Sequence, residues 1–305
     1  MNETKREPDG VLVINKHAGP TSHDIVNKIR RLYGTKKVGH TGTLDPMAEG
    51  VLVVLVGRAA KAAEYLATDS KKYRATLRLG IETDTQDVTG EVLKKVEGML
   101  PSADAVMEIC HGFVGKINQV PPMYSALKVG GKKLLDLARQ GITVERQARP
   151  VEIFSLDCKP INDSDYTLDV HCSGGTYIRT LCADIGEKLG CGGTMATLCR
   201  TETGGFPIEK SHTIKQLEEI TENERLSLLI PTETLFADLP AVKLPAFYEK
   251  LCRSGCEIYQ KKIKTDCEIG QRVRICDETG EFFALGEVKE YENGTAIKAI
   301  KTFNL

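Results

Sequence analysis

The spacing of apolar residues changes twice within the first eighty residues, and this change most constrains the fold. In residues 25–33 apolar side chains recur every three or four positions, which predicts a helix. Residues 51–56 are an unbroken apolar run, typical of a buried strand. In residues 73–79 apolar and basic or polar residues alternate, which predicts a strand buried on one face only. Helices and strands mixed in this irregular order favour the α+β fold class.

A proline-punctuated acidic segment near residue 240 divides the chain. Its prolines are Pro231, Pro240 and Pro245. After it, the pattern predicts one helix followed by three short strands. Because domain boundaries fall in such linkers, we predict a large domain over residues 1–240 and a small β-rich domain over residues 241–305.

Composition is that of an ordinary globular protein, with 41% hydrophobic and 27% charged residues. The run at residues 51–56 is far shorter than the ~20 apolar residues of a membrane span. The first ten residues lack the apolar part of a signal peptide, so we expect a cytoplasmic protein. Ten cysteines without a CxxC pair then indicate reduced thiols, and we expect no metal site.

Residues 38–52, VGHTGTLDPMAEGVL, have the most constrained backbone in the sequence. Three are glycines, and Pro46 favours an extended conformation at Asp45. A carboxylate held in this way could carry chemistry. Alternatively, Asp45 could cap a short helix that begins at Pro46. Ala48 stands where a capping box would have Glu or Gln, which argues against the cap.

The stretch GHTGTLDPMAEGVL resembles the catalytic loop of the TruB family of tRNA pseudouridine synthases. The resemblance continues in collinear order through NKHAGPTS, KKYRATLRLGIETDTQDVTG, QVPPMYSALKVGGKKLLDLARQG and SGGTYIRTL, and covers most of residues 10–206. It implies a mixed-sheet pseudouridine synthase catalytic domain. The C-terminal region resembles a small, β-barrel-like, PUA-type RNA-binding domain.

The resemblance implies that Asp45 is the essential catalytic carboxylate and that Arg179 is its partner. A guanidinium beside a carboxylate favours its ionised form, so we expect a lowered pKa for Asp45. The resemblance implies substrate-binding roles for five further side chains: Tyr73, His40, Tyr177, Leu198 and Lys16.

Each of these five has an expected task and a structural alternative. Tyr73 would pack against uracil, His40 would fill the space that a flipped base leaves, Tyr177 and Leu198 would line the pocket, and Lys16 would brace the catalytic loop. From the residues alone, Tyr73 and Leu198 could equally be core side chains. His40 could equally be a hydrogen-bonded loop histidine.

The family isomerises uridine 55 in the T-loop of tRNA, so the resemblance implies an RNA-modifying enzyme that acts by base flipping. An aspartate-dependent break of the glycosidic bond and its re-formation as C1′–C5 needs no cofactor. Residues 119–149, with the lysines of 128–133, would bind the T-arm. Whether Asp45 attacks C1′, attacks C6 or removes a sugar proton stays open.

Two alternatives remain at this point. One is a guide-RNA-dependent synthase that works in a ribonucleoprotein, and the other is a non-catalytic tRNA-binding or tRNA-folding protein. The net charge of −1 provides no general attraction to RNA, so binding must rely on local basic patches. We expect a monomer whose partner is the tRNA T-arm, without a membrane or an obligatory protein partner.

Overall fold

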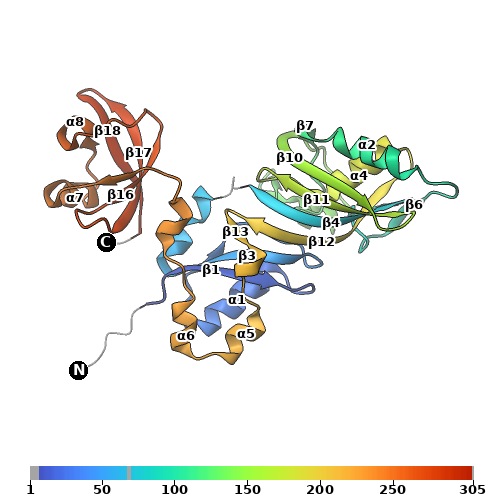
Figure 1. Cartoon of the computed structure of the whole chain (residues 1–305), viewed down its shortest axis with the longest axis horizontal. Coiled ribbons are helices and arrows are strands. Elements are labelled where there is room, and N and C mark those ends of the chain that lie inside the picture. The colour runs from blue at the N-terminus through green and yellow to red at the C-terminus, as the bar shows by residue number, and fades with distance from the viewer. Residues whose placement is uncertain (1–6, 67–69, 304–305) are drawn as a thin grey trace.

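The computed structural model describes residues 7–66 and 70–303. Within these residues, nine strands form one large sheet and five form a second sheet in the C-terminal region (Figure 1). Two short hairpins stand apart from both sheets. The architecture confirms the predicted α+β class. Residues 1–6, 67–69 and 304–305 of the predicted domains lie outside the described residues.

The large sheet has the spatial order β1-β3-β12-β4-β11-β10-β7, with β2 paired to β3 and β13 to β12. Its strands are β1 (Gly10–Lys16), β2 (Val38–His40), β3 (Glu49–Val56), β4 (Lys71–Leu79), β7 (Gly115–Gln119), β10 (Arg149–Pro160), β11 (Asp165–Cys172), β12 (Gly193–Thr203) and β13 (Phe206–Pro207). Among the described residues, only the β12–β3 pairing in this sheet is parallel. This pairing sets Arg200 beside Gly50, at the start of β3.

Helices cover one face of the large sheet. They are α1 (Ser22–Leu32), α2 (Ala103–His111), α4 (Ile178–Lys188), α5 (Ile214–Glu219) and α6 (Glu222–Ser227). The α1 helix begins at the predicted place, because Thr21 caps it in a reciprocal pair of hydrogen bonds with Asp24. Apolar side chains of α1, α2, α4 and α5 pack with the inward residues of the strands in one core, which burial of their apolar surface stabilises.

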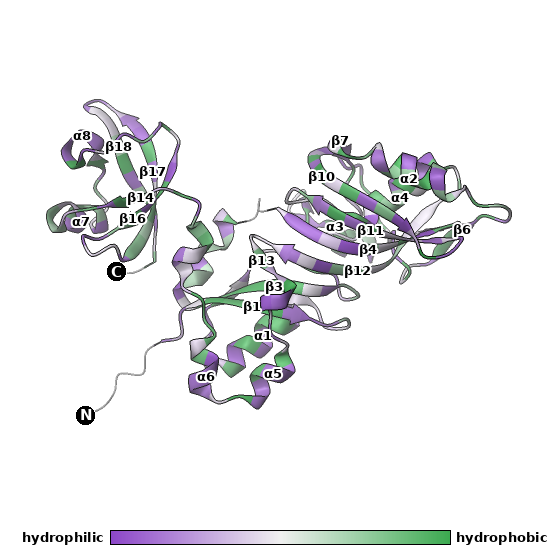
Figure 2. Cartoon of the chain, viewed as in Figure 1, coloured by the Kyte–Doolittle hydropathy of each residue, from purple (hydrophilic) through white to green (hydrophobic). Residues whose placement is uncertain are grey.

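The opposite face of the large sheet is covered over only part of its width. On this face, over β1 and β3, a second core contains side chains of η1 (Gly57–Tyr65), η3 (Thr232–Phe236) and the C-terminal sheet. In Figure 2, β1 and β3 are accordingly apolar over most of their length, whereas β4 mixes apolar and polar residues. Behind β4 and β11, two-pronged ion pairs join Arg74 to Asp169 and Arg78 to Asp165 across the strands.

The C-terminal sheet has the order β14-β16-β17-β18-β15 and forms a separate lobe in Figure 1. Its elements are β14 (Ala241–Lys243), α7 (Ala246–Arg253), β15 (Ile258–Tyr259), α8 (Gln260–Ile263), β16 (Arg272–Cys276), β17 (Phe282–Tyr291) and β18 (Gly294–Thr302). The lobe has a core of its own. However, Phe282, Leu285 and Phe303 pack into the core behind β1 and β3, so the lobe also completes the large domain.

The remaining elements are short and lie between the main strands. They are β5 (Ile81–Thr83), β6 (Val92–Lys95), β8 (Lys128–Val129), β9 (Lys132–Lys133), α3 (Leu134–Ala138) and η2 (Ile208–Lys210). None of the helices within residues 7–66 and 70–303 combines the length and apolarity that a membrane span requires.

Candidate active site

The loop 41–48 joins β2 to β3 and carries Asp45. After Asp45 the chain makes a single turn, in which the Ala48 N–H donates to the Asp45 carbonyl at 3.1 Å, and β3 then begins at Glu49. No helix starts at Pro46, so the interpretation of Asp45 as a helix cap is wrong. The Asp45 side chain keeps 35% of its surface exposed, which leaves it open to a ligand.

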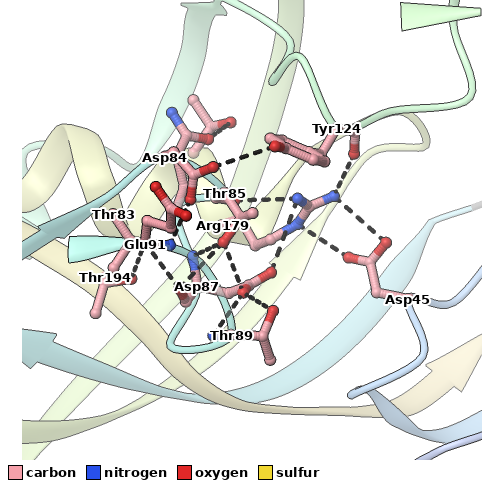
Figure 3. A network of polar contacts seen from close by, with 12 residues as sticks. Asp45, Thr83, Asp84, Thr85, Asp87, Thr89, Glu91, Tyr124, Arg179 and Thr194 are labelled. Atoms are coloured by element: carbon pink, nitrogen blue, oxygen red, sulfur yellow. Dashed lines mark hydrogen bonds and ion pairs between the residues drawn. The ribbon is translucent and has the colours of Figure 1, made fainter. Parts of the chain in front are cut away.

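Arg179 binds both carboxylate oxygens of Asp45 (Figure 3). Its Nε lies 2.9 Å from Oδ2, and its Nη2 donates to Oδ1 at 3.3 Å. Arg179 is the second residue of α4 and its side chain is 5% exposed. A two-pronged pair of this kind fixes the orientation of the carboxylate as well as its position.

The rest of the Arg179 guanidinium is also held. Nη1 donates to the carbonyl of Thr85 at 3.1 Å, and Nη2 donates to the carbonyl of Tyr124 at 2.8 Å. Asp87 Oδ2 lies 3.9 Å from Nη1. The carboxylate of Asp87 is in turn bonded by the hydroxyls of Thr85 and Thr89 (Figure 3). These contacts fix the orientation of the Arg179 guanidinium, and so fix the edge that it presents to Asp45.

Asp87 was not among the residues predicted from the sequence. It is 5% exposed and lies in the loop between the β5 and β6 strands. The signal that could have found it is its composition, TDTQDVTG, in which an aspartate lies two residues from a threonine on either side. Such hydroxyls are placed to bond a carboxylate in a tight turn.

The pKa of Asp45 is raised above its usual value, not lowered as expected. Burial removes water from the carboxylate and is the largest cause. Arg179 and, more weakly, Lys16 oppose the rise, whereas the negative charge of Asp87 adds to it. In its ionised form, such a carboxylate is a stronger base and nucleophile than one whose pKa has been lowered.

Lys16 ends β1 beneath the loop 41–48 and is fully buried. Its Nζ donates to the carbonyls of His17 and Pro46, each at 3.1 Å, and to that of Ala48 at 2.5 Å. Burial lowers the pKa of Lys16 to about 8. The amine thus holds the backbone on the C-terminal side of Asp45.

Arg200, which was not predicted from the sequence, is a further buried cation at this loop. Its Nε donates to the Val51 carbonyl at 2.7 Å, and Nη2 and Nη1 donate to the carbonyls of Gly42 and Thr43 at 3.0 and 3.5 Å. The signal for it was weak. Leu198 and Arg200 have strand spacing in TLCRTETGG, so the arginine is expected on the same face as an apolar residue.

Tyr73 and Leu198 lie on neighbouring strands. In the β4–β12 register Tyr73 pairs with Arg200 and Leu198 pairs with Ala75, and both side chains are 8% exposed. Burial raises the pKa of Tyr73, Arg200 lowers it, and the nearby charge of Asp45 raises it further. Tyr73 is therefore close enough to Asp45 for their charges to interact.

Tyr177 and His40 are the remaining two predicted substrate-binding residues. The backbone of Tyr177 is held by the buried side chain of Gln119, through bonds of 2.8 and 3.0 Å to its N–H and carbonyl. His40 ends β2, and burial lowers its pKa. Its buried Nδ1 has no hydrogen-bond partner, and no hydrogen bond or ion pair joins it to Asp45, within the residues that the structure describes. In the same part of the chain, no group of three or more His, Cys, Asp or Glu side chains is placed to hold a metal.

Comparison with known proteins identifies this arrangement. A tRNA pseudouridine synthase B of Alkaliphilus oremlandii is 43% identical over 296 residues, which are 96% of this chain and 98% of the relative. The chain belongs to the TruB family. The tRNA pseudouridine synthase B of Haemophilus influenzae is 40% identical, over 96% of this chain and 94% of the relative.

Two family domains match the residues that carry Asp45 and Arg179. Residues 30–178 match the N-terminal domain of TruB family pseudouridylate synthases, and residues 179–237 match the C-terminal domain of tRNA pseudouridylate synthase B. Asp45 belongs to the first match and Arg179 begins the second. Their ion pair therefore joins the two TruB segments.

A chain in a solved complex has a similar fold. The crystal structure of a Cbf5-Nop10-Gar1 complex contains a chain that superposes with a TM-score of 0.74 at 27% identity, covering 97% of this chain and 85% of that one. The likeness spans both sheets of the present structure, because nearly the whole chain is covered.

Proposed function

We propose that this protein converts uridine to pseudouridine in tRNA, at position 55 of the T-loop. The two-pronged pair of Asp45 and Arg179 supports this most directly. It presents a partly exposed carboxylate of raised pKa in a fixed orientation, beside a buried tyrosine. The names of the relatives, which match nearly the whole chain, support tRNA as the substrate.

The proposed reaction breaks the bond between N1 of uracil and C1′ of the ribose, and forms a bond between C5 and C1′. The base turns between the two steps, C5 loses its proton, and N1 gains one. There is no net oxidation or reduction and no group is added from outside, so the reaction needs no redox cofactor and no group donor. Asp45 serves as nucleophile or base, because a carboxylate can trap the sugar or the base, or remove a sugar proton.

The other side chains are proposed to hold the flipped uridine. Tyr73 packs against the uracil ring and Leu198 forms the wall beside it. Tyr177 lines the same pocket, and Lys16 braces the loop of Asp45 from below. His40 fills the gap that the extruded base leaves in the T-loop. Its neutral ring, favoured by the lowered pKa, suits insertion between bases.

Residues 119–149 are proposed to bind the T-arm. The hairpin of β8 and β9 exposes Lys128, Lys132 and Lys133, and ammonium groups there can contact phosphates of the RNA backbone. Residues 1–240 would then form the catalytic domain, and residues 241–305 a PUA-like domain that adds RNA contacts. We propose that the protein acts as a monomer.

The guide-RNA-dependent synthase considered from the sequence stays the second candidate, because a chain that is part of a complex with other proteins, the Cbf5-Nop10-Gar1 complex, shares the fold. The relatives named tRNA pseudouridine synthase B are more similar in sequence and match in full length, which favours action on tRNA without a guide. A non-catalytic RNA-binding protein is disfavoured, because Asp45 and its partner are both present and in contact.

The test uses purified protein and a T-arm hairpin whose target uridine carries tritium at C5. We expect release of tritium in step with pseudouridine formation, without any other protein or guide RNA. Release only after a guide RNA and partner proteins are added would favour the second candidate. Binding without release under either condition would favour the non-catalytic alternative.

Base flipping has its own test. A fluorescent base analogue at the target position should brighten on binding as it loses its stacking. His40→Ala should reduce that signal and weaken the complex more than it slows the bound reaction. An unchanged signal with active wild-type protein, or full activity on an unstructured strand, would count against extrusion from a folded loop.

A further inference from the structure

We propose that Arg200 is a positioning residue of this reaction, whose guanidinium fixes the backbone on the N-terminal side of Asp45. The inference rests on the proposed function, because positioning matters only if Asp45 reacts. It assigns Arg200 no contact with the substrate. Its effect is exerted through the main chain of the loop 41–48.

The contacts of Arg200 tie the loop to the sheet. The guanidinium bonds Val51 within β3, and Gly42 and Thr43 in the loop. One planar group therefore links the strand that follows Asp45 with the backbone that precedes it. A lysine cannot reproduce this link, because a single ammonium lacks the rigid fork of donors.

The backbone of Arg200 is itself immobilised. Gly50 lies beside it in the parallel β3–β12 register, with a φ of +97°. A Cβ atom at Gly50 would come within 2.2 Å of the Arg200 carbonyl oxygen, so only glycine permits this approach. The guanidinium thus extends from a fixed point to the loop.

Other residues hold the remainder of the loop, which isolates what Arg200 adds. The Ser22 hydroxyl bonds both the N–H and the carbonyl of Leu44, at 2.8 and 3.0 Å. Lys16 holds the carbonyls of Pro46 and Ala48. Arg200 bonds the carbonyls of Gly42 and Thr43, which neither Ser22 nor Lys16 reaches.

The charge of Arg200 also argues for more than packing. The side chain is 1% exposed, and it forms no ion pair within the described residues. Burying an unpaired cation is costly, and an apolar side chain would fill the same space without that cost. Two of its three nitrogens instead donate to the loop that carries the reacting carboxylate, and the guanidinium also interacts with the Tyr73 hydroxyl.

The experiment compares Arg200→Lys with Arg225→Lys. Arg225 is a matched control, since its Nη1 also donates to two carbonyls, those of Leu217 and Ile220 in the α5–α6 pair. The readouts are the single-turnover rate at saturating T-arm hairpin, the Kd for that hairpin, and amide hydrogen exchange of residues 41–50.

We expect Arg200→Lys to slow the single-turnover rate by about 10- to 100-fold, because a displacement of about 1 Å can have an effect of that size. The Kd should stay within about threefold, and exchange in residues 41–50 should rise. Arg225→Lys should keep the rate within about twofold. A folded Arg200→Lys variant with a wild-type rate, or a rate loss equal to that of Arg225→Lys, overturns the proposal.

If Arg200→Lys does not fold, Gly42→Val decides. A Cβ at Gly42 would lie 3.4 Å from Nη1, in ordinary van der Waals contact, and Gly42 has no positive φ, so valine adds two methyl groups beside the guanidinium without the strain of a positive φ. A wild-type rate in that variant overturns the proposal, and a slow rate at unchanged Kd supports it. Failure of the proposed function is separate, because it would show as no product from the wild-type protein.

Discussion

Two loops meet at Arg179, and they are held very differently. In the loop 41–48, side chains of Lys16, Ser22 and Arg200 bond the carbonyls on both sides of Asp45. In the segment 119–149, the main ties lie near the start, where Gln119 bonds the backbone of Tyr177 and the carbonyl of Tyr124 accepts from Arg179. The lysines beyond are exposed.

The contrast separates chemistry from recognition. A reacting carboxylate gains from being fixed before the substrate arrives, since no free energy is then spent on ordering it during the reaction. A surface that follows an RNA backbone gains from long exposed side chains that can adjust to phosphates. Changes in the first loop should therefore lower the rate, and changes in the second should lower the affinity.

Asp45→Asn is the most severe test of the first loop. The change keeps the shape of the side chain but removes its negative charge, so turnover should fall by about 10³-fold or more while RNA binding persists. Tritium release and a binding titration measure the two quantities. Comparable turnover in the folded variant would show that Asp45 is not the catalytic carboxylate.

Replacing Lys128, Lys132 and Lys133 together by Gln should affect the second loop alone. We expect RNA affinity to fall by about tenfold or more at physiological salt. The slope of log affinity against log salt concentration should become shallower, by the amount that two or three lost phosphate contacts predict. The rate at saturating RNA should stay within about twofold. A rate that falls as much as the affinity would show that the segment 119–149 contributes to the chemistry and not only to RNA binding.

Asp87→Asn tests the contact between Asp87 and the guanidinium of Arg179. The negative charge of Asp87 raises the pKa of Asp45, so its removal should move the acid limb of the single-turnover rate to lower pH. Because Asp87 also fixes Arg179, the rate at the plateau should drop by about tenfold. An acid limb that moves to higher pH would contradict the sign of this interaction.

Lys16 should produce the smallest effect, a loss of rate at alkaline pH. With a pKa of about 8, its amine is charged below that pH and loses one donor and its charge above it. The saturated rate should therefore fall several-fold between pH 7 and 9, and Lys16→Met should have a lower rate without this limb. A wild-type rate that is flat over this range would show that the charge of Lys16 does not hold the loop of Asp45.

Much of the fold could be predicted from local pattern. Residues 73–79 and 165–172 are strands with one buried face, so their alternation is visible in the sequence. The β10 strand is less visible, because it lies near the sheet edge, exposes many of its residues and has a bulge between Ile153 and Ser155.

The site divides in the same way. Asp45, Arg179 and Tyr73 lie in motifs that can be compared with a family, and the structure brings them together. Arg200 depends on the parallel pairing of β12 with β3, which no local pattern shows. The raised pKa of Asp45 was missed for a related reason, because its cause is burial by segments distant in the sequence.

The core behind β1 and β3 has a consequence for synthesis of the chain. These strands leave the ribosome early, whereas Phe236, Phe282 and Phe303, which cover them, emerge late. At about 5 to 20 residues per second, roughly 10 to 50 s separate the two events. During that interval the nascent protein displays an uncovered apolar surface that a chaperone can recognise. A chain terminated before Phe282 would leave part of this surface uncovered, so we expect it to aggregate more readily than the full chain.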